Sequence, residues 1–100
     1  MKTHLLRGPI DLSRSEFEEH FRKQIDQAIV NGDGFIVGDE DGADRIFQFY
    51  LAGKTKKVTV FSEGEFPRFN LGFSCSSGHG NSIKEAMKRN ANNEITWFGD

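Results

Sequence analysis

The chain has only one cysteine, no long apolar run and no surplus of basic residues, and each of these features excludes a class of protein. Because Cys75 stands alone, no internal disulfide can form, which favours a reducing, cytoplasmic setting. No apolar run approaches the roughly 18 residues that cross a bilayer, and the N-terminus lacks the apolar core of a signal peptide. The formal net charge of −2 does not provide the basic surface that nucleic acid requires. We therefore expect a cytoplasmic protein with neither a membrane nor a nucleic acid as partner.

Metal-binding patterns are also missing from the sequence. The three histidines and the single cysteine lie far apart and do not have the spacing of zinc ligands. The acids at 39, 40, 41 and 44 do not follow the twelve-residue pattern of a calcium loop. We therefore expect no metal and no other cofactor.

The apolar residues that are present predict one α/β domain over residues 1–100. Four short apolar runs alternate with three helical patterns, and the runs cover residues 3–6, 35–37, 58–61 and 95–98. Ser13 and Glu16 have the spacing of a capping box at the start of the first helix. This alternation predicts a small three-layer Rossmann-like domain with a mainly parallel four-stranded sheet and three helices. Both strand orders 3-2-1-4 and 2-1-3-4 fit the pattern, and the first is the commoner.

One segment, residues 62–81, interrupts this alternation. It has about twenty residues without a helical or strand period, and a loop of that length is usually a functional lid or an insertion. It follows the third predicted strand, so it begins at the carboxyl edge of the sheet. Ligands of open α/β sheets bind at that edge.

The strongest candidate site is the run Phe-Ile-Val-Gly-Asp-Glu-Asp-Gly-Ala-Asp, residues 35–44. It has the layout of a strand, a tight loop and a helix N-terminus, where the phosphate or sugar of a nucleotide-like ligand usually lies. Gly38 and Gly42 allow close approach of a ligand to the backbone. Acidic side chains would repel a phosphate. Asp41 and Asp44 can instead have a structural role, because Asp41 can cap the helix and Asp44 lies in its first turn.

Two further candidates lie at the same predicted edge. Arg7 and Gly8 follow the first strand, where Arg7 is either a phosphate ligand or an exposed residue of a simple turn. In the long segment, Arg68 and the donor-rich run Ser76-Ser77-Gly78 are candidates to hold an anion. His79 lacks an orienting partner in the sequence, so a solvated loop histidine is the more frequent outcome.

Several short motifs resemble the SLOG superfamily, whose Rossmann-like domains include the Lonely Guy hydrolases and the DNA-processing Smf proteins. The motifs span nearly the whole chain: Gly8 after the first strand, Gly38 through Gly42-Ala43-Asp44, Val58-Thr59-Val60, Pro67-Arg68, Ala86-Met87 and Ile95-Thr96-Trp97. The resemblance implies recognition of a nucleotide or a nucleotide-derived molecule, and in some members cleavage of an N-glycosidic bond. The hydrolase branch carries a P-G-G-x-G-T-x-x-E motif that is absent here, so the resemblance implies binding more directly than catalysis.

The leading hypothesis is therefore a small domain that binds a nucleotide-like small molecule at the carboxyl edge. Its predicted ligand-binding residues are Arg7, Gly8, Gly38, Asp39, Gly42, Ala43, Asp44, Arg68, Ser76, Ser77 and Gly78. The first alternative is an enzyme that hydrolyses or transfers N-glycosidic bonds of nucleoside monophosphates, with Asp44, Glu65 or Glu40 as the catalytic acid. The second is a ligand-free interaction protein, such as a homodimer joined through helix faces, for which exposed Phe66, Phe69 and Phe73 in the long segment would suit a partner surface.

Overall fold

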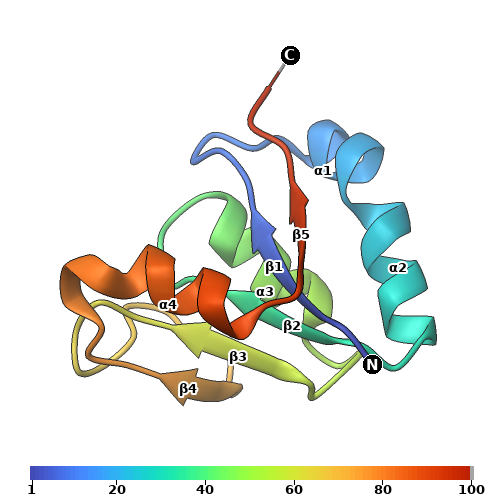
Figure 1. The fold of residues 1–100 in the computed structure, drawn as a ribbon. Helices are drawn as coiled ribbons and strands as arrows, with labels where there is room; N and C mark the ends of the chain where they lie inside the picture. Colours follow the sequence, from blue (N-terminus) through green and yellow to red (C-terminus); the bar gives the residue numbers. More distant parts are fainter. Residues whose placement is uncertain (100) are drawn as a thin grey trace.

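The computed structural model describes residues 1–99 of the chain. Within them lie five strands, four α-helices and one 3₁₀ turn (Figure 1). The strands are β1 (Thr3–Arg7), β2 (Gly34–Val37), β3 (Val58–Phe61), β4 (Ser74–Ser76) and β5 (Asn93–Thr96). The helices are α1 (Arg14–His20), α2 (Arg22–Val30), α3 (Ala43–Leu51) and α4 (Ile83–Asn90), and the 3₁₀ turn η1 covers Gly80–Ser82.

All the strand pairs are parallel, and the order across the sheet is β4-β3-β2-β1-β5. The four predicted strands therefore have the order 3-2-1-4, and the Rossmann-like α/β class is confirmed. The predicted count of four strands was too low, because β4 pairs with the outer edge of β3 through Thr59↔Ser74 and Phe61↔Ser76. This strand reads Ser-Cys-Ser and lies at an exposed edge, so it lacks the apolar pattern that identifies buried strands.

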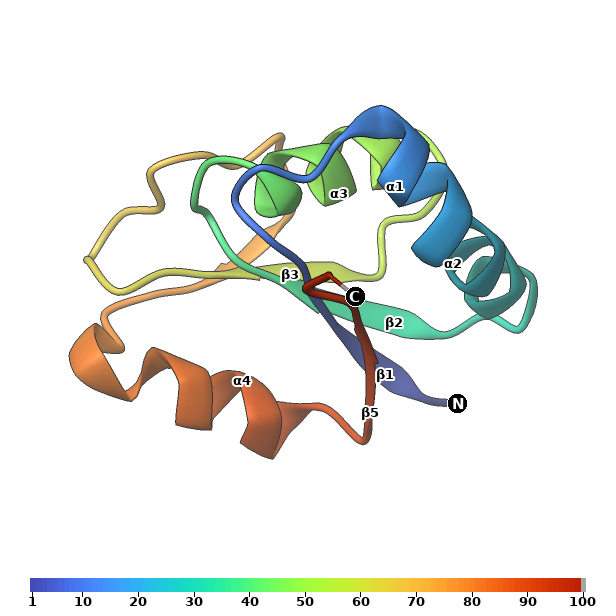
Figure 2. The same cartoon turned by 90° about the horizontal axis from the view of Figure 1, so that it is seen from above.

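Helices cover both faces of the sheet, which gives the expected three layers. Figure 2 shows α1, α2 and α3 on one face and α4 on the other. Successive strand residues point to opposite faces, so the side chains of the sheet contribute to two hydrophobic cores, one on each face. Leu5, Ile36 and Phe61 pack with Ala86 and Met87 of α4.

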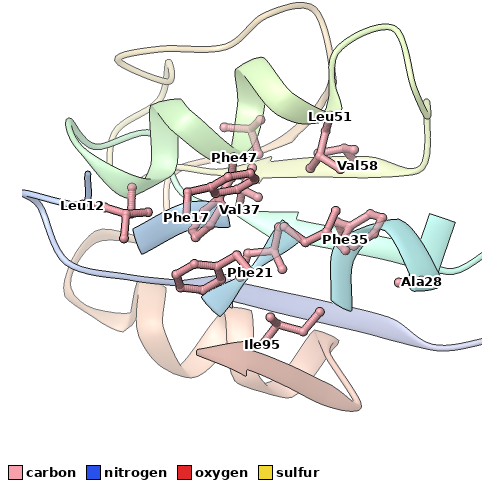
Figure 3. Packing of buried hydrophobic residues seen from close by; sticks show 14 residues of the cluster. Leu12, Phe17, Phe21, Ala28, Phe35, Val37, Phe47, Leu51, Val58 and Ile95 are labelled. Atoms are coloured by element: carbon pink, nitrogen blue, oxygen red, sulfur yellow. The ribbon is translucent and has the colours of Figure 1, made fainter. Parts of the chain in front are cut away.

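The larger core lies beneath α1, α2 and α3. Phe17, Phe21, Phe35 and Phe47 account for much of its volume, and Figure 3 shows their rings between the helices and the sheet. Phe21 and Phe47 meet edge to face, with ring centroids 4.9 Å apart. Four of the ten phenylalanines in the sequence are thus buried in this layer.

The first and last predicted elements differ from the structure in their bounds. The single predicted first helix is divided at Phe21, where φ −124° and ψ −44° separate α1 from α2. Its start is as predicted, because Ser13 and Glu16 form the reciprocal bonds of a capping box. The last strand ends at Thr96, two residues before its predicted end, since its partner β1 ends at Arg7 in register with Thr96.

The long segment after β3 is fastened to α3 by a buried glutamine. Gln48 is fully buried, and its Nε2 donates to the carbonyls of Gly38 and Phe69, each at 3.0 Å. Its Oε1 accepts from the backbone N–H of Leu71 at 3.1 Å. The segment is thus held by specific bonds although its sequence has no period.

A polar network joins three strands at the amino edge of the sheet. His4 Nε2 lies 2.8 Å from Asp33 Oδ2, and its Nδ1 lies 2.8 Å from Asn93 Nδ2. The hydrogen bond with His4, together with one from the backbone N–H of Lys2, holds the pKa of Asp33 below its ordinary value. Asp33 thereby links β1 to the start of β2.

None of the helices in residues 1–99 has the length and apolarity needed to span a membrane.

Candidate functional site

A cleft of about 230 Å³ opens at the carboxyl edge of the sheet. The loops that follow β1 and β2 form one side of the cleft, and α4 forms the other. The segments after β3 and β5 also contribute lining residues. Helices on opposite faces leave such a crevice at the strand ends of an open α/β sheet. Its lining residues are Leu6, Arg7, Gly8, Ile10, Gly38, Asp39, Glu40, Asp41, Asp44, Glu63, Arg68, Ile83, Lys84, Met87 and Phe98.

Gly38 and Asp44 form the floor of the cleft at the end of β2. A Cβ atom at Gly38 would overlap Oδ2 of Asp44, so only glycine leaves room for this carboxylate. Asp44 Oδ2 accepts a hydrogen bond from the backbone N–H of Glu40 at 3.1 Å. Burial raises the pKa of Asp44 from 3.8 to about 6, and the backbone bonds from Glu40 and Gly38 offset part of that rise. A carboxyl group with this pKa exchanges its proton near neutral pH.

Asp39 attaches the long segment to the end of β2. Its carboxylate is 2 % exposed and accepts from the backbone N–H of Arg68 at 2.7 Å and from Arg68 Nη2 at 3.2 Å. Glu40 Oε1 lies 3.5 Å from the same nitrogen. The bond to Asp39 raises the pKa of the Arg68 guanidinium above its ordinary value. Asp39 and Arg68, both predicted ligand residues, therefore already bind each other at the cleft.

Arg7 and Gly8 reach the cleft from the end of β1. A Cβ at Gly8 would lie 3.1 Å from Ala43 Cβ and 3.2 Å from Phe21 Cζ, so the glycine lets β1 approach α3 closely. The guanidinium of Arg7 lies 5.3 Å from the ring centroid of Phe98, in cation–π geometry. Its Nη1 is also 3.9 Å from Glu94. Both residues lie where the sequence pattern predicts.

The residues at the start of α3 have structural contacts instead. Gly42 is the N-cap with φ +79°, and a Cβ there would overlap the backbone of Ile10. Ala43 is buried beside it. The expectation that Asp41 caps α3 was wrong, because the N-cap is Gly42 and Asp41 instead pairs with Arg45 at 2.9 Å. Gly42 and Ala43 therefore support the cleft from outside its lining.

The donor-rich run of the long segment also lies outside the cleft lining. Ser76 Oγ is 2.7 Å from His79 Nε2, and the N–H of Gly78 donates to the carbonyl of Gly64 at 2.7 Å. Ser77 is exposed beside them. These bonds close the base of the segment where β4 leads into η1. Of the three carboxylates predicted as catalytic, Asp44 and Glu40 line the cleft, whereas Glu65 is exposed beyond it.

Sequence reasoning did not assign seven of the lining residues to the site. These are Ile10, Glu63, Ile83, Lys84 and Met87, together with Leu6 and Phe98, which were predicted only as parts of strands. The three from α4 could not be assigned without the strand order, because only the return of the chain from β4 to β5 brings α4 beside the end of β1. Glu63 lies two residues after β3, a position that the edge rule points to.

In residues 1–99 no three side chains among histidine, cysteine, aspartate and glutamate are arranged to hold a metal ion. Comparison with known proteins found no match to a family model, to a curated protein or to a solved structure.

Proposed function

We propose that this chain is a small cytoplasmic domain that binds a nucleotide or a nucleotide-derived ligand in the cleft at the carboxyl edge of its sheet. The observation that supports the proposal most is convergence: the residues that follow β1, β2 and β3 line one cleft with α4. Ligands of open parallel sheets bind at this position. The SLOG-like motifs at Gly8 and at residues 38–44 lie around the same cleft, and membership of that superfamily is part of the proposal.

The chemistry of the lining is consistent with a sugar-bearing heterocycle. The carboxylates of Glu40, Asp44 and Glu63 accept hydrogen bonds, and ribose hydroxyls are donors that match them. The ring of Phe98 and the apolar side chains of Ile83 and Met87 offer surface to a flat base.

A thermal-shift screen with nucleosides and nucleotides tests the binding role. Lys84 and Lys88 are both exposed on α4 one turn apart, but only Lys84 lines the cleft. We expect at least one ligand to raise the melting temperature of the wild type and of Lys88→Trp, and to lose its effect in Lys84→Trp, where the indole fills the cleft. If no ligand stabilises the wild type, or if the two variants respond alike, the proposal fails.

An enzyme that cleaves N-glycosidic bonds is the second candidate, and the pKa of Asp44 favours it. A carboxyl group with a pKa of about 6 in a cleft is suited to proton transfer near neutral pH. The test is release of free base from nucleoside monophosphates by the wild type and by Asp44→Asn. We expect any release to fall at least about a hundredfold in Asp44→Asn. Equal release by both proteins would exclude Asp44 as the catalytic acid.

A homodimer is the third candidate, and two exposed phenylalanines favour it. Phe66 is 79 % exposed in the long segment and Phe49 is 63 % exposed on α3. The expected patch is smaller than the sequence predicts, because Phe69 packs on Phe49 and Phe73 packs against the main core. Light scattering of the wild type and of Phe66→Ser separates this candidate from the others. A monomeric mass for the wild type would rule out the homodimer.

A further inference from the structure

The place where this fold usually holds a phosphate is occupied by the protein itself. In related architectures an anion binds at the N-terminus of the helix that follows a strand. Here the carboxylate of Asp44 lies in the first turn of α3 and accepts the N–H of Glu40 at 3.1 Å. The backbone of Ile10 lies against Gly42, so the chain after β1 covers the N-cap. A ligand phosphate would have to displace both.

The charges that line the cleft also oppose a phosphate. Five carboxylates line it, namely Asp39, Glu40, Asp41, Asp44 and Glu63, against three cations, namely Arg7, Lys84 and Arg68. Arg68 Nη2 lies 3.2 Å from Asp39, and Arg7 Nη1 lies 3.9 Å from Glu94. Two of the three cations therefore already have a carboxylate neighbour, and each phosphate on a ligand adds repulsion.

The size and the apolar walls of the cleft favour a small ligand with a flat ring. Its volume of about 230 Å³ is below the range of roughly 300–1,000 Å³ typical of sites for drug-sized ligands. Ile10, Ile83 and Met87 provide apolar wall, and the half-exposed ring of Phe98 also lines the cleft. A heterocycle with one sugar suits this space better than a ligand with a polyphosphate chain.

Resting on the proposed function, we infer that the cleft accepts an unphosphorylated nucleoside and discriminates against nucleoside di- and triphosphates. The base packs on the apolar wall and Phe98, and the ribose hydroxyls donate to the carboxylates of Glu40, Asp44 and Glu63. Selectivity comes from repulsion of the phosphates by these same acids. The acid-rich loop thus excludes ligands that the fold otherwise favours.

Calorimetric titration of the full chain with four matched series tests this inference. Each series contains a nucleoside and its mono-, di- and triphosphate, with adenine, guanine, cytosine or uracil as the base, at one ionic strength and without divalent cations. Two unit charges about 7 Å apart in water change an affinity about threefold. We expect the triphosphate to bind at least about tenfold more weakly than its nucleoside. Affinity that increases with phosphate number would overturn the inference and leave the proposed function standing, whereas no binding in any series would overturn both.

A matched pair of variants assigns the selectivity to the cleft. Glu40 lines the cleft and Glu85 does not, and both are exposed, so Glu40→Gln and Glu85→Gln remove the same charge with little effect on folding. We expect Glu40→Gln to reduce the preference for the nucleoside over its triphosphate by at least about threefold, before screening by salt, because it removes repulsion from the phosphates together with a charged acceptor for a ribose hydroxyl. Glu85→Gln should leave both affinities near those of the wild type. Equal effects of the two variants would attribute the selectivity to net charge and overturn the inference.

Discussion

The substitution Asp44→Asn should stabilise the protein at neutral pH and have little effect in acid. Asp44 lies on the floor of the cleft, where burial raises its pKa from 3.8 to about 6. Asparagine has nearly the same shape and keeps an oxygen that accepts the N–H of Glu40. The substitution therefore removes the charge while it preserves the contact.

The size of the effect follows from the raised pKa. A pKa change of one corresponds to about 1.4 kcal/mol, so a rise from 3.8 to about 6 represents about 3 kcal/mol. At a pH below the unfolded-state pKa of 3.8, Asp44 is neutral in both the folded and the unfolded state, so it does not destabilise the fold. Between pH 3.8 and about 6 the unfolded chain ionises at Asp44 while the folded protein keeps the proton, because this half-buried carboxyl group is costly to ionise in the cleft. Wild-type stability therefore falls over this window, and about 3 kcal/mol is an upper limit for the gain.

Urea unfolding followed by circular dichroism from pH 4 to pH 7.5 measures this gain. We expect the free energy of unfolding of Asp44→Asn to exceed that of the wild type by roughly 1–3 kcal/mol at pH 7.5 and by under about 1 kcal/mol at pH 4. The control is Asp41→Asn in the same loop, since Asp41 forms an exposed ion pair and should contribute at most about 1 kcal/mol at either pH. A difference for Asp44→Asn that stays constant with pH would refute the reasoning.

Three further predictions concern the residues around the cleft and the amino edge. Asp39→Asn should destabilise the protein by about 1–3 kcal/mol and speed hydrogen exchange in residues 62–81, because it weakens the anchor of that segment. Gly38→Ala should cost about 1–3 kcal/mol in urea unfolding, and less in an Asp44→Ala background, because the added Cβ overlaps that carboxylate. Asp33→Asn should reduce the loss of stability in acid, since a carboxylate with a lowered pKa loses its stabilising contribution as pH falls through that pKa, and acid titration of both proteins measures this.

The sequence allows most of the sheet to be predicted because its central strands are buried on both faces. The apolar runs at 35–37 and 58–61 lie within β2 and β3, since a strand covered on both sides is continuously apolar. β4 has no such pattern, because it is an edge strand whose serines and cysteine are largely exposed. The end of β5 depends on how far β1 extends beside it, which local propensity does not report.

The candidate site was likewise predicted in part. Arg7, Gly8 and Gly38 lie in the cleft because each directly follows or ends a parallel strand, and the ends of parallel strands meet at one edge. Ser76 and Gly78 also lie near a strand end, but that strand is the outermost of the sheet, away from the cleft. The strand order decides how far each strand end lies from the cleft. Because the sequence fits two strand orders, it does not predict which loops reach the cleft.

Binding in the cleft is most directly tested by nuclear magnetic resonance of the labelled full chain during titration with nucleosides and nucleotides. We expect saturable changes in the resonances of the backbone amides of Gly8, Gly38, Asp39, Glu40 and Lys84, all of which line the cleft. The resonances of residues around the exposed Phe49 and Phe66 should not change. Changes confined to that surface, or none with any ligand of the panel, would contradict binding in the cleft.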